Sequence, residues 1–371
     1  MCPSVSTLVC VHLQHTCDHT FSRTILLFQS RYRYAFPASR WNTRWQSARF
    51  ESHSKQRETR VLLIRLESRM NRTCRDTYHR LEDIHGYLDY LAETFPDVCS
   101  VVSIGNSVEG RPLKVLRISN GKANAPALWI DGGIHAREWI SPAAVTYIIN
   151  HLVENSEDLE ADYYILPVVN PDGYEYTFTR DRLWRKNRKR SVGSLCTGVD
   201  LNRNFGYRWG GLGTSKDPCR EIYAGSGPFS EPETNAIRYF FEASAANFKV
   251  THNYSKNTPT IFILYPWGYD RRVPPDYADL EDVGKQAATA MKKAGGANSV
   301  YTVGNSATTL YPASGGSDDW AKAILKMKYT YTIELKDTGK YGFVLPARYI
   351  IPTAKEALAA VMVVTEACKS L

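Results

Sequence analysis

The stretch Gly133-Ile134-His135-Ala136-Arg137-Glu138-Trp139 directly follows an apolar run, Ala127 to Ile130, that is typical of a buried strand. It places an imidazole and a carboxylate three residues apart, within one local backbone frame. Both side chains suit a zinc ion. Pairs with this spacing also arise by chance on many helices, so a metal site requires a third ligand from a distant part of the chain.

Length and charge limit the classes of protein that the sequence can encode. The 371 residues contain no tract of eighteen apolar residues, which predicts a globular chain that is not embedded in a membrane. The net charge is +8, and residues 1–75 carry 13 Lys+Arg against 4 Asp+Glu, a balance of +9, so the remainder sums to −1. Because this basic part lacks a dense cluster or repeated motif, we predict that the protein binds neither nucleic acid nor membrane.

Residues 1–72 differ in character from the rest of the chain. They are rich in Arg, Ser and aromatic residues without sustained periodicity, and three of the eight cysteines fall within the first seventeen positions. Ser4 to Leu13 could form the core of a signal peptide, but it lacks a basic region before it and a clean cleavage site after it. We therefore expect a disordered or atypical segment at 1–72 and one folded domain at 73–371.

The pattern becomes regular from about Thr77. Four apolar residues with helical spacing share one face, with Asp76 or Thr77 as the cap: Leu81, Ile84, Leu88 and Leu91. Strands are expected at Val101–Ile104, Leu113–Ile118, Ala127–Asp131, Tyr163–Val169, Phe248–Thr251 and Tyr329–Leu335, and helices at Trp139–Asn155 and Ala354–Ala367. The turn Asn170-Pro171-Asp172-Gly173 is expected to end the fourth strand. Strands that alternate with helices predict an α/β sheet covered on both faces.

Ligands of such sheets bind beyond the carboxyl ends of the strands. His135, His252 and Glu334 are all predicted to lie at or just after such ends. An isolated histidine such as His252 more often packs in a core, but it is the only histidine after His151 and has no rival as a distant ligand. Two imidazoles and one carboxylate make up a catalytic zinc site with an open fourth position.

Cys196 and Cys219 flank a loop that carries Asp200-Leu201-Asn202-Arg203-Asn204. A disulfide that closes this loop would favour an oxidising compartment, and two unrelated thiols are equally consistent with the spacing. The glycosylation sequon Asn71-Arg72-Thr73 is a further mild indication of secretion.

Seven motifs in the same order resemble a known family. They are GIHAREWIS (133–141), NPDGYEYT (170–177), RLWRKNR (182–188), GVDLNRNF (198–205), LYPWGY (264–269), TTLYPASGGSDDW (308–320) and ELKDTGKYGF (334–343). From about residue 75 onward the chain resembles the catalytic domain of a zinc metallocarboxypeptidase of the pancreatic and digestive A/B type, peptidase family M14. The resemblance implies one α/β domain with a central mixed, mostly eight-stranded sheet flanked by helices, and hydrolysis of the C-terminal peptide bond.

The resemblance also implies a ligand set. By their places in the motifs, His135, Glu138 and His252 are expected to bind one zinc ion (Zn2+) per chain. Zinc lowers the pKa of bound water and polarises a carbonyl group. Asp200 matches a carboxylate that orients the first histidine ligand.

Two further residues match catalytic positions of the family. Glu334 corresponds to the general base, which takes a proton from water and returns it to the leaving amine. Arg185 corresponds to the residue that stabilises the oxyanion. Three neighbouring basic side chains are expected to form solvated surface: Arg182, Lys186 and Arg188.

An exopeptidase must also hold a free α-carboxylate. Arg203 offers a bidentate guanidinium fork and Asn202 a neutral donor. Arg137 resembles an auxiliary residue of the substrate cleft, and Tyr311 resembles the mobile tyrosine that covers the terminal residue. The pair Cys196–Cys219 matches the family disulfide.

The side-chain pocket is expected to determine specificity. By resemblance Asp318 lies at its bottom, where A-type enzymes place an apolar residue and B-type enzymes an Asp. A buried carboxylate there would pair with Lys or Arg, because leaving it unpaired is costly. Ser306 keeps the pocket open, whereas Gly268 resembles the A-type choice. We predict a preference for C-terminal Lys or Arg, with an A-like preference for apolar C-termini as the alternative.

The chain departs from the family pattern in three places, one of which is a shorter stretch between Asn150 and Tyr163, away from the chemistry. The segment after His252 is longer than the family pattern, so it either bulges outward or displaces the third ligand. Displacement would leave an impaired pseudoenzyme or a peptide-binding protein. Residues 1–72 do not resemble an activation domain, so zymogen control is not predicted. The family and the predicted disulfide imply a secreted monomer that acts on peptide and protein C-termini and is open to proteinaceous carboxypeptidase inhibitors.

Overall fold

The computed structural model describes residues 77–244, 248–255, 262–296, 299–335, 341–369 and 371, with the backbone alone at 249–255. The predicted N-terminal segment 1–72 lies outside these residues, as does the boundary at residue 73. No helix within the described ranges is both long enough and apolar enough to cross a membrane.

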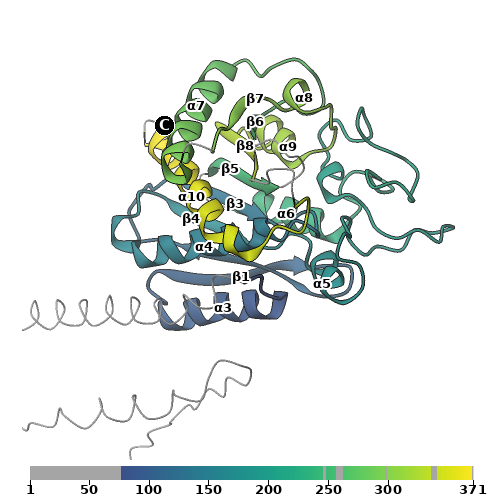
Figure 1. Cartoon of the computed structure of the whole chain (residues 1–371), viewed down its shortest axis with the longest axis horizontal. Coiled ribbons are helices and arrows are strands. Elements are labelled where there is room, and N and C mark those ends of the chain that lie inside the picture. The colour runs from purple at the N-terminus through teal and green to yellow at the C-terminus, as the bar shows by residue number, and fades with distance from the viewer. Residues whose placement is uncertain (1–76, 245–247, 256–261, 297–298, 336–340, 370) are drawn as a thin grey trace, which may run out of the picture. The chain divides into compact units, whose positions relative to one another are not determined.

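The described strands form one mixed sheet in the order β1-β2-β4-β3-β5-β8-β6-β7 (Figure 1). Its strands are β1 (Cys99–Asn106), β2 (Pro112–Ile118), β3 (Ala127–Gly132), β4 (Asp162–Leu166), β5 (Phe248–Ser255), β6 (Phe262–Tyr265), β7 (Thr302–Asn305) and β8 (Tyr329–Glu334). The four central strands β4, β3, β5 and β8 are parallel to one another. Antiparallel pairing joins β1 to β2, β2 to β4 and β6 to β8.

Helices cover both faces of the sheet, which confirms the predicted α/β class. They are α3 (Leu81–Thr94), α4 (Ile140–Glu154), α5 (Pro171–Thr179), α6 (Pro232–Ala243), α7 (Tyr277–Gly295), α8 (Ser306–Thr309), α9 (Ser317–Ala323) and α10 (Ile350–Cys368). One apolar core lies between the sheet and α4, α7 and α10, and a second lies between the opposite face and α6 and α9. In β3 the side chains alternate between these cores, with Leu128 and Ile130 in the first and Trp129 in the second.

The predicted face of α3 is confirmed, because Leu81, Ile84, Leu88 and Leu91 are its buried residues. The cap was predicted wrongly. Arg80 occupies the N-cap position, and its backbone N–H donates to Asp83 Oδ2 at 3.2 Å. Position 77 lies outside the helix, and Asp76 is outside the described residues.

The turn predicted at 170–173 is instead the start of a helix. β4 ends at Leu166, and α5 begins at Pro171. Asn170 Oδ1 accepts a hydrogen bond from Gly173 N at 2.9 Å, which satisfies an amide of the first helical turn. Proline at the first helical position lacks the amide that would otherwise be unpaired there.

The position of His252 also differs from the prediction. β5 continues to Ser255, and the backbone register pairs His252 with Ile130 of β3 and Tyr331 of β8. Ser255 is the residue opposite Glu334. His252 therefore lies three positions inside the strand rather than at its end, and its side chain lies outside the described residues.

Candidate functional site

The chain leaves β3 through a turn that requires glycine. Gly133 has a φ of +64°, and a Cβ there would lie 2.9 Å from Pro142 Cγ. Its amide donates to Ser141 Oγ at 2.9 Å, which ties the turn to the first residues of α4. This short link between strand and helix holds His135 and Glu138 beyond the end of the sheet.

His135 and Glu138 lie together and are 2% and 1% exposed. Nδ1 of His135 is 3.0 Å from Glu138 Oε1, and Nε2 is 3.1 Å from Asp200 Oδ1. An ionised Asp200 only accepts hydrogen bonds, so Nε2 of His135 is the donor of that contact, and in the neutral ring that binds a metal Nδ1 carries the lone pair facing Glu138. With the ring neutral, this nitrogen and the Glu138 carboxylate are two metal-ligand atoms close enough to share one cation.

Asp200 is held ionised by its surroundings. Its Oδ2 accepts from Arg185 Nε at 3.1 Å and from Arg185 Nη2 at 2.8 Å, and both side chains are buried. Burial alone raises the pKa of Asp200, but the positive charges of Arg185 and Arg203 outweigh it and hold that pKa well below its usual value. The carboxylate thus connects the predicted oxyanion donor with the predicted ligand His135.

The third predicted ligand cannot be placed beside this pair. Within the described residues, no three His, Cys, Asp or Glu side chains gather in a metal-binding arrangement. The side chain of His252 is outside the described residues, so its place relative to this pair stays a prediction. His135 and Glu138 lie side by side and carry the side chains that zinc prefers, and their role as metal ligands stays a prediction.

Glu334 is the last residue of β8 and is buried. Across the parallel strands, Gly132 pairs with Tyr254, which pairs with Ile333. Glu334 therefore lies at the same edge of the sheet where the chain leaves β3 toward His135. This placement agrees with the prediction from sequence that both residues lie at or just after strand ends.

Tyr311 is 40% exposed and lies in the connection between α8 and α9. Burial lowers the pKa of Arg185, whereas Asp200 and, more weakly, Tyr311 raise it, with a net upward shift.

A second group of polar residues surrounds the start of α9. Asn202 Oδ1 accepts from Ser317 N at 3.1 Å and from Ser317 Oγ at 3.2 Å. Ser306 Oγ lies 3.4 Å from Asp318 Oδ2 and 3.2 Å from Tyr265 O, so it can donate to either oxygen. Asn202, predicted to bind the α-carboxylate, therefore lies at the start of the helix that carries Asp318, and Asp318 contacts Ser306, its predicted neighbour in the side-chain pocket.

Arg203 lies between the candidate metal site and the polar residues at the start of α9. Its Nη1 donates to Asn202 O at 2.9 Å and its Nε donates to Gly213 O at 3.0 Å. Its charge acts on both Asp200 and Asp318. A guanidinium in this position connects the candidate metal site to the candidate pocket.

The adjacent residues Asp318 and Asp319 have different surroundings. Asp318 is 6% exposed, and no ion pair joins it to a Lys or Arg within the described residues; Lys322 of the same helix pairs with Asp276 instead. Burial raises the pKa of Asp318. Asp319 accepts from the amides of Gly268 and Tyr269 at 2.7 and 2.9 Å. Sequence reasoning missed this role of Asp319 in fixing the pocket wall, although the Asp-Asp doublet was a signal.

Residues 84–360 match the family described as zinc carboxypeptidase. The chain belongs to this family. Carboxypeptidases of this family are metallocarboxypeptidases, which are peptide hydrolases, so the predicted family and enzyme class are confirmed.

Similar proteins include carboxypeptidases of both named types. Carboxypeptidase B of Astacus astacus is 45% identical over 302 residues, which are 79% of this chain and 97% of that protein. Carboxypeptidase A4 of Mus musculus is 44% identical over 291 residues, 75% of this chain and 67% of that protein. Bovine thrombin-activatable fibrinolysis inhibitor, solved in complex with a tick carboxypeptidase inhibitor, superimposes with a TM-score of 0.76 at 40% identity over 80% of this chain and 99% of that one. Likeness to both types leaves the preferred C-terminal residue open.

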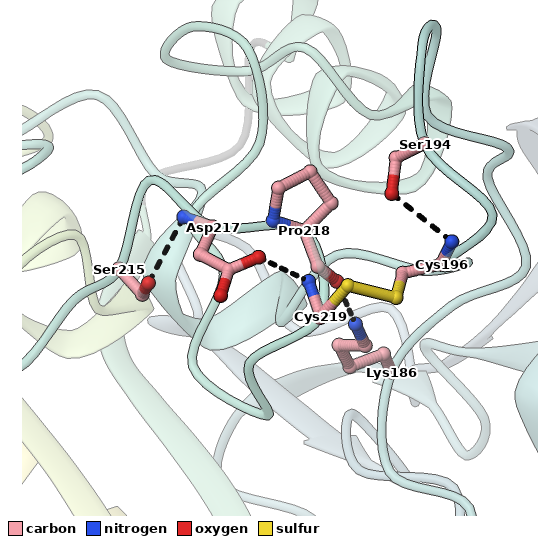
Figure 2. The surroundings of a disulfide bond; sticks show 7 residues. All are labelled: Lys186, Ser194, Cys196, Ser215, Asp217, Pro218 and Cys219. Atoms are coloured by element: carbon pink, nitrogen blue, oxygen red, sulfur yellow. Dashed lines mark hydrogen bonds between the residues drawn. A yellow bond between two sulfur atoms is a disulfide. The ribbon is translucent and has the colours of Figure 1, made fainter.

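The disulfide of this carboxypeptidase joins Cys196 to Cys219, as the resemblance predicted (Figure 2). Beside it, the Lys186 ammonium donates to the carbonyl of Pro218 at 2.7 Å. Cys196 N donates to Ser194 Oγ at 3.1 Å. These contacts attach the segment that leads into Asp200 to the segment around residue 218.

Two basic residues next to Arg185 are not the solvated surface that was predicted. Lys186 is buried, because its ammonium is engaged by Pro218 O. Arg182 is half-buried, stacks 3.6 Å above the Trp139 ring, and donates to the carbonyls of Arg137 and Phe343. Both side chains hold loops around the site in place.

Arg137 forms part of the same rim. Its guanidinium lies 4.2 Å from the ring centre of Phe343, and its Nη1 donates to Glu221 Oε2 at 3.2 Å. Burial and, more weakly, the positive charge of Arg185 lower the pKa of Arg137. Its place along the substrate cleft stays a prediction.

A buried acidic pair behind the site was not predicted. Asn187 Nδ2 donates to Glu231 Oε2 at 2.7 Å and to Glu233 Oε2 at 3.1 Å. Asn187 Oδ1 accepts from Val199 N at 2.8 Å, next to Asp200. Burial raises the pKa of Glu233 to about 7, with Glu231 adding to the rise and hydrogen bonds opposing it.

Glu233 should make stability fall as pH rises. Because its folded-state pKa is above the unfolded one, its stabilising contribution is full below the unfolded pKa and is lost as pH rises through about 7. We expect wild type to lose up to about 3 kcal/mol more unfolding free energy between pH 5 and pH 8 than Glu233→Gln does. Urea unfolding of both proteins at the two pH values measures this, and equal losses would contradict it.

Proposed function

We propose that this chain is a zinc-dependent exopeptidase that hydrolyses the C-terminal peptide bond of proteins and peptides and prefers C-terminal Lys or Arg. The observation that carries the proposal is the buried connection from Glu138 through His135 and Asp200 to Arg185. It joins candidate metal ligands to a candidate oxyanion donor in one rigid unit.

His135, Glu138 and His252 would hold one zinc ion. When bound, zinc supplies Lewis acidity, which polarises a carbonyl group and acidifies water. The contribution of Asp200 is orientation: it accepts from Nε2 of His135 and keeps the lone pair on Nδ1. Fixing the ring in this way also favours one tautomer.

Two side chains would carry the proton transfer and the charge. Glu334 would accept a proton from the attacking water and return it to the leaving amine, which avoids both a free hydroxide and an amide anion. Arg185 would donate to the carbonyl oxygen as it becomes negative. Because its ion pair with Asp200 already fixes the guanidinium, little reorganisation is needed when that charge develops.

The free α-carboxylate of a substrate needs donors between the metal side and the side-chain pocket. Arg203 lies there, and Asn202 is held in place by Ser317. A guanidinium and an amide would bind the carboxylate by charge-assisted hydrogen bonds. Tyr311 would cover the terminal residue, and Arg137 would bind the peptide further along the cleft.

A buried carboxylate supports the preference for basic residues. Asp318 has no basic protein partner within the described residues, and Ser306 beside it is small. A Lys or Arg side chain entering the pocket would supply the missing positive charge. The A-like alternative is favoured by Gly268, where a Cβ would lie 3.7 Å from Ser306 Cβ, so that its absence widens the pocket for an aromatic ring.

Turnover of hippuryl-Arg against hippuryl-Phe tests the preference. We expect a higher kcat/KM for hippuryl-Arg, and we expect Asp318→Asn to lower that value by about 30-fold or more, equivalent to 2 kcal/mol or more for an unpaired buried charge. Turnover of hippuryl-Phe by the same variant is the internal control and should change little. A wild-type preference for hippuryl-Phe would establish the A-like alternative.

Metal analysis of the purified protein tests the enzyme itself. One zinc per chain together with turnover of either substrate supports the exopeptidase. Absence of both zinc and turnover would instead support a pseudoenzyme or peptide-binding protein, in which His252, located inside β5, does not reach the metal.

The proposal also includes where the protein acts and what binds it. A disulfide between Cys196 and Cys219 favours an oxidising compartment, so we place the protein outside the cell. A similar structure was solved with a tick carboxypeptidase inhibitor, so we propose proteinaceous inhibitors of that kind as partners, and we propose that the protein is a monomer.

A further inference from the structure

A short hairpin, residues 189–198, presents two cations that the proposed chemistry does not use. Lys189 and Arg190 are exposed, and neither forms an ion pair within the described part of the chain. Arg188 differs, because its guanidinium stacks 3.7 Å from the ring centre of Tyr176 and 4.4 Å from that of Trp184. The hairpin therefore offers a dibasic pair at its base with the third cation held against the body of the protein.

Among the described residues, few contacts hold the tip of the hairpin against the rest of the protein. Val192 and Leu195 are fully exposed, with relative exposures of 105% and 104%. The backbone–backbone hydrogen bond described within the tip is long, 3.3 Å from Ser194 N to Ser191 O. Such a segment opens at low free-energy cost, which is what a peptidase needs to draw a peptide bond into its active site.

The base of the hairpin, in contrast, is anchored on both sides. Gly198 N donates to Lys189 O at 2.7 Å, and Asn187 N donates to Val199 O at 3.0 Å. Cys196 is bonded to Cys219. Beyond these anchors, Arg185 and Asp200 form the buried ion pair described above. Contacts on both sides of the tip would therefore survive a cut within it.

We propose that the hairpin is a processing site for trypsin-like serine peptidases, which nick the folded protein at the Arg190–Ser191 bond. Water adds across that bond, so that Arg190 gains a carboxylate and Ser191 an amino group. Pockets of the trypsin type select Lys or Arg before the cleaved bond. The product is a two-chain protein that stays folded through the anchors at the hairpin base.

A second exposed dibasic pair, Arg271-Arg272, provides the comparison. Arg272 is paired with Asp270 at 2.6 Å, and its carbonyl accepts from Asn305 Nδ2 at 3.2 Å. The backbone is engaged at both dibasic pairs, since Lys189 O accepts from Gly198 N and Arg190 forms a bridge with Thr197. The difference is in the side chains, because Arg272 is ion-paired, whereas Lys189 and Arg190 form no ion pair within the described residues. We expect the hairpin to be cut first.

Brief digestion of the full chain with a low concentration of trypsin tests the proposal. The readout is a fragment whose new amino terminus is Ser191, because amino termini are unaffected by the exopeptidase activity of the protein. That fragment should separate on a denaturing gel without reductant, since Cys196 and Cys219 both lie on its side of the cut. In size-exclusion chromatography the two fragments should elute together.

The Lys189→Gln/Arg190→Gln variant should form this fragment at least about tenfold more slowly, because a trypsin-type pocket lacks its cation there. The Arg271→Gln/Arg272→Gln variant is the matched control and should be cut at the wild-type rate. An earlier cut between Cys196 and Cys219, recognised as fragments that separate only after reduction, would overturn the proposal. Equal rates for the two variants, or dissociation of the nicked chains, would overturn it as well.

Discussion

The Glu334→Gln variant is expected to lose about two to four orders of magnitude in kcat for hippuryl-Arg, the usual contribution of general acid–base catalysis. Glu334 is buried at the end of β8, at the sheet edge where the chain turns toward His135. Glutamine preserves shape and polarity but cannot take a proton from water. KM should change little, because the substrate contacts proposed for Arg203 and Asp318 remain.

Zinc content and thermal unfolding of the variant serve as controls, and both should match wild type because Glu334 is not among the proposed ligands. A variant with normal kcat would refute the assignment of the base. A variant that loses zinc along with activity would show that Glu334 belongs to the metal site instead, so kinetics and metal analysis must be done on the same preparation.

The pattern of apolar residues in the sequence was sufficient to predict those structural features that depend only on residues close together in the chain. The buried face of α3 follows from the 3.6-residue period of Leu81, Ile84, Leu88 and Leu91, and the structure confirms each of them. The end of β3 is also local, since the apolar run predicted a strand ending at Asp131 and the strand ends at Gly132.

Features that depend on distant partners were beyond this kind of inference. Lys186 was expected to be solvated, but Pro218, thirty-two positions away, supplies the carbonyl that buries its ammonium. The end of β5 depends on how long β3 and β8 continue to pair with it, so the location of His252 within the strand was missed. Asp318 and Asp319 are adjacent in sequence, and only the amides of the Gly268 turn distinguish their roles.

The largest expected effect on stability comes from Arg185→Met. The substitution removes the guanidinium and leaves the buried Asp200 carboxylate without its main partner. Removing one member of a buried ion pair costs about 3–5 kcal/mol, so the free energy of unfolding should fall by that amount. Because Arg185 is also the proposed oxyanion donor, kcat should fall by about 10²–10³-fold.

The double variant Arg185→Met/Asp200→Asn separates these two roles. Asparagine removes the unpaired charge and can still accept from Asn202 N or from Nε2 of His135, so part of the lost unfolding free energy should return. Activity should not return, because the donor to the developing oxyanion is still missing and a less basic partner now orients His135. Urea unfolding and hippuryl-Arg turnover of the wild type, the single variant and the double variant measure both quantities. If activity recovers in step with stability, Arg185 acts only by holding the fold, and the oxyanion must be stabilised by another group.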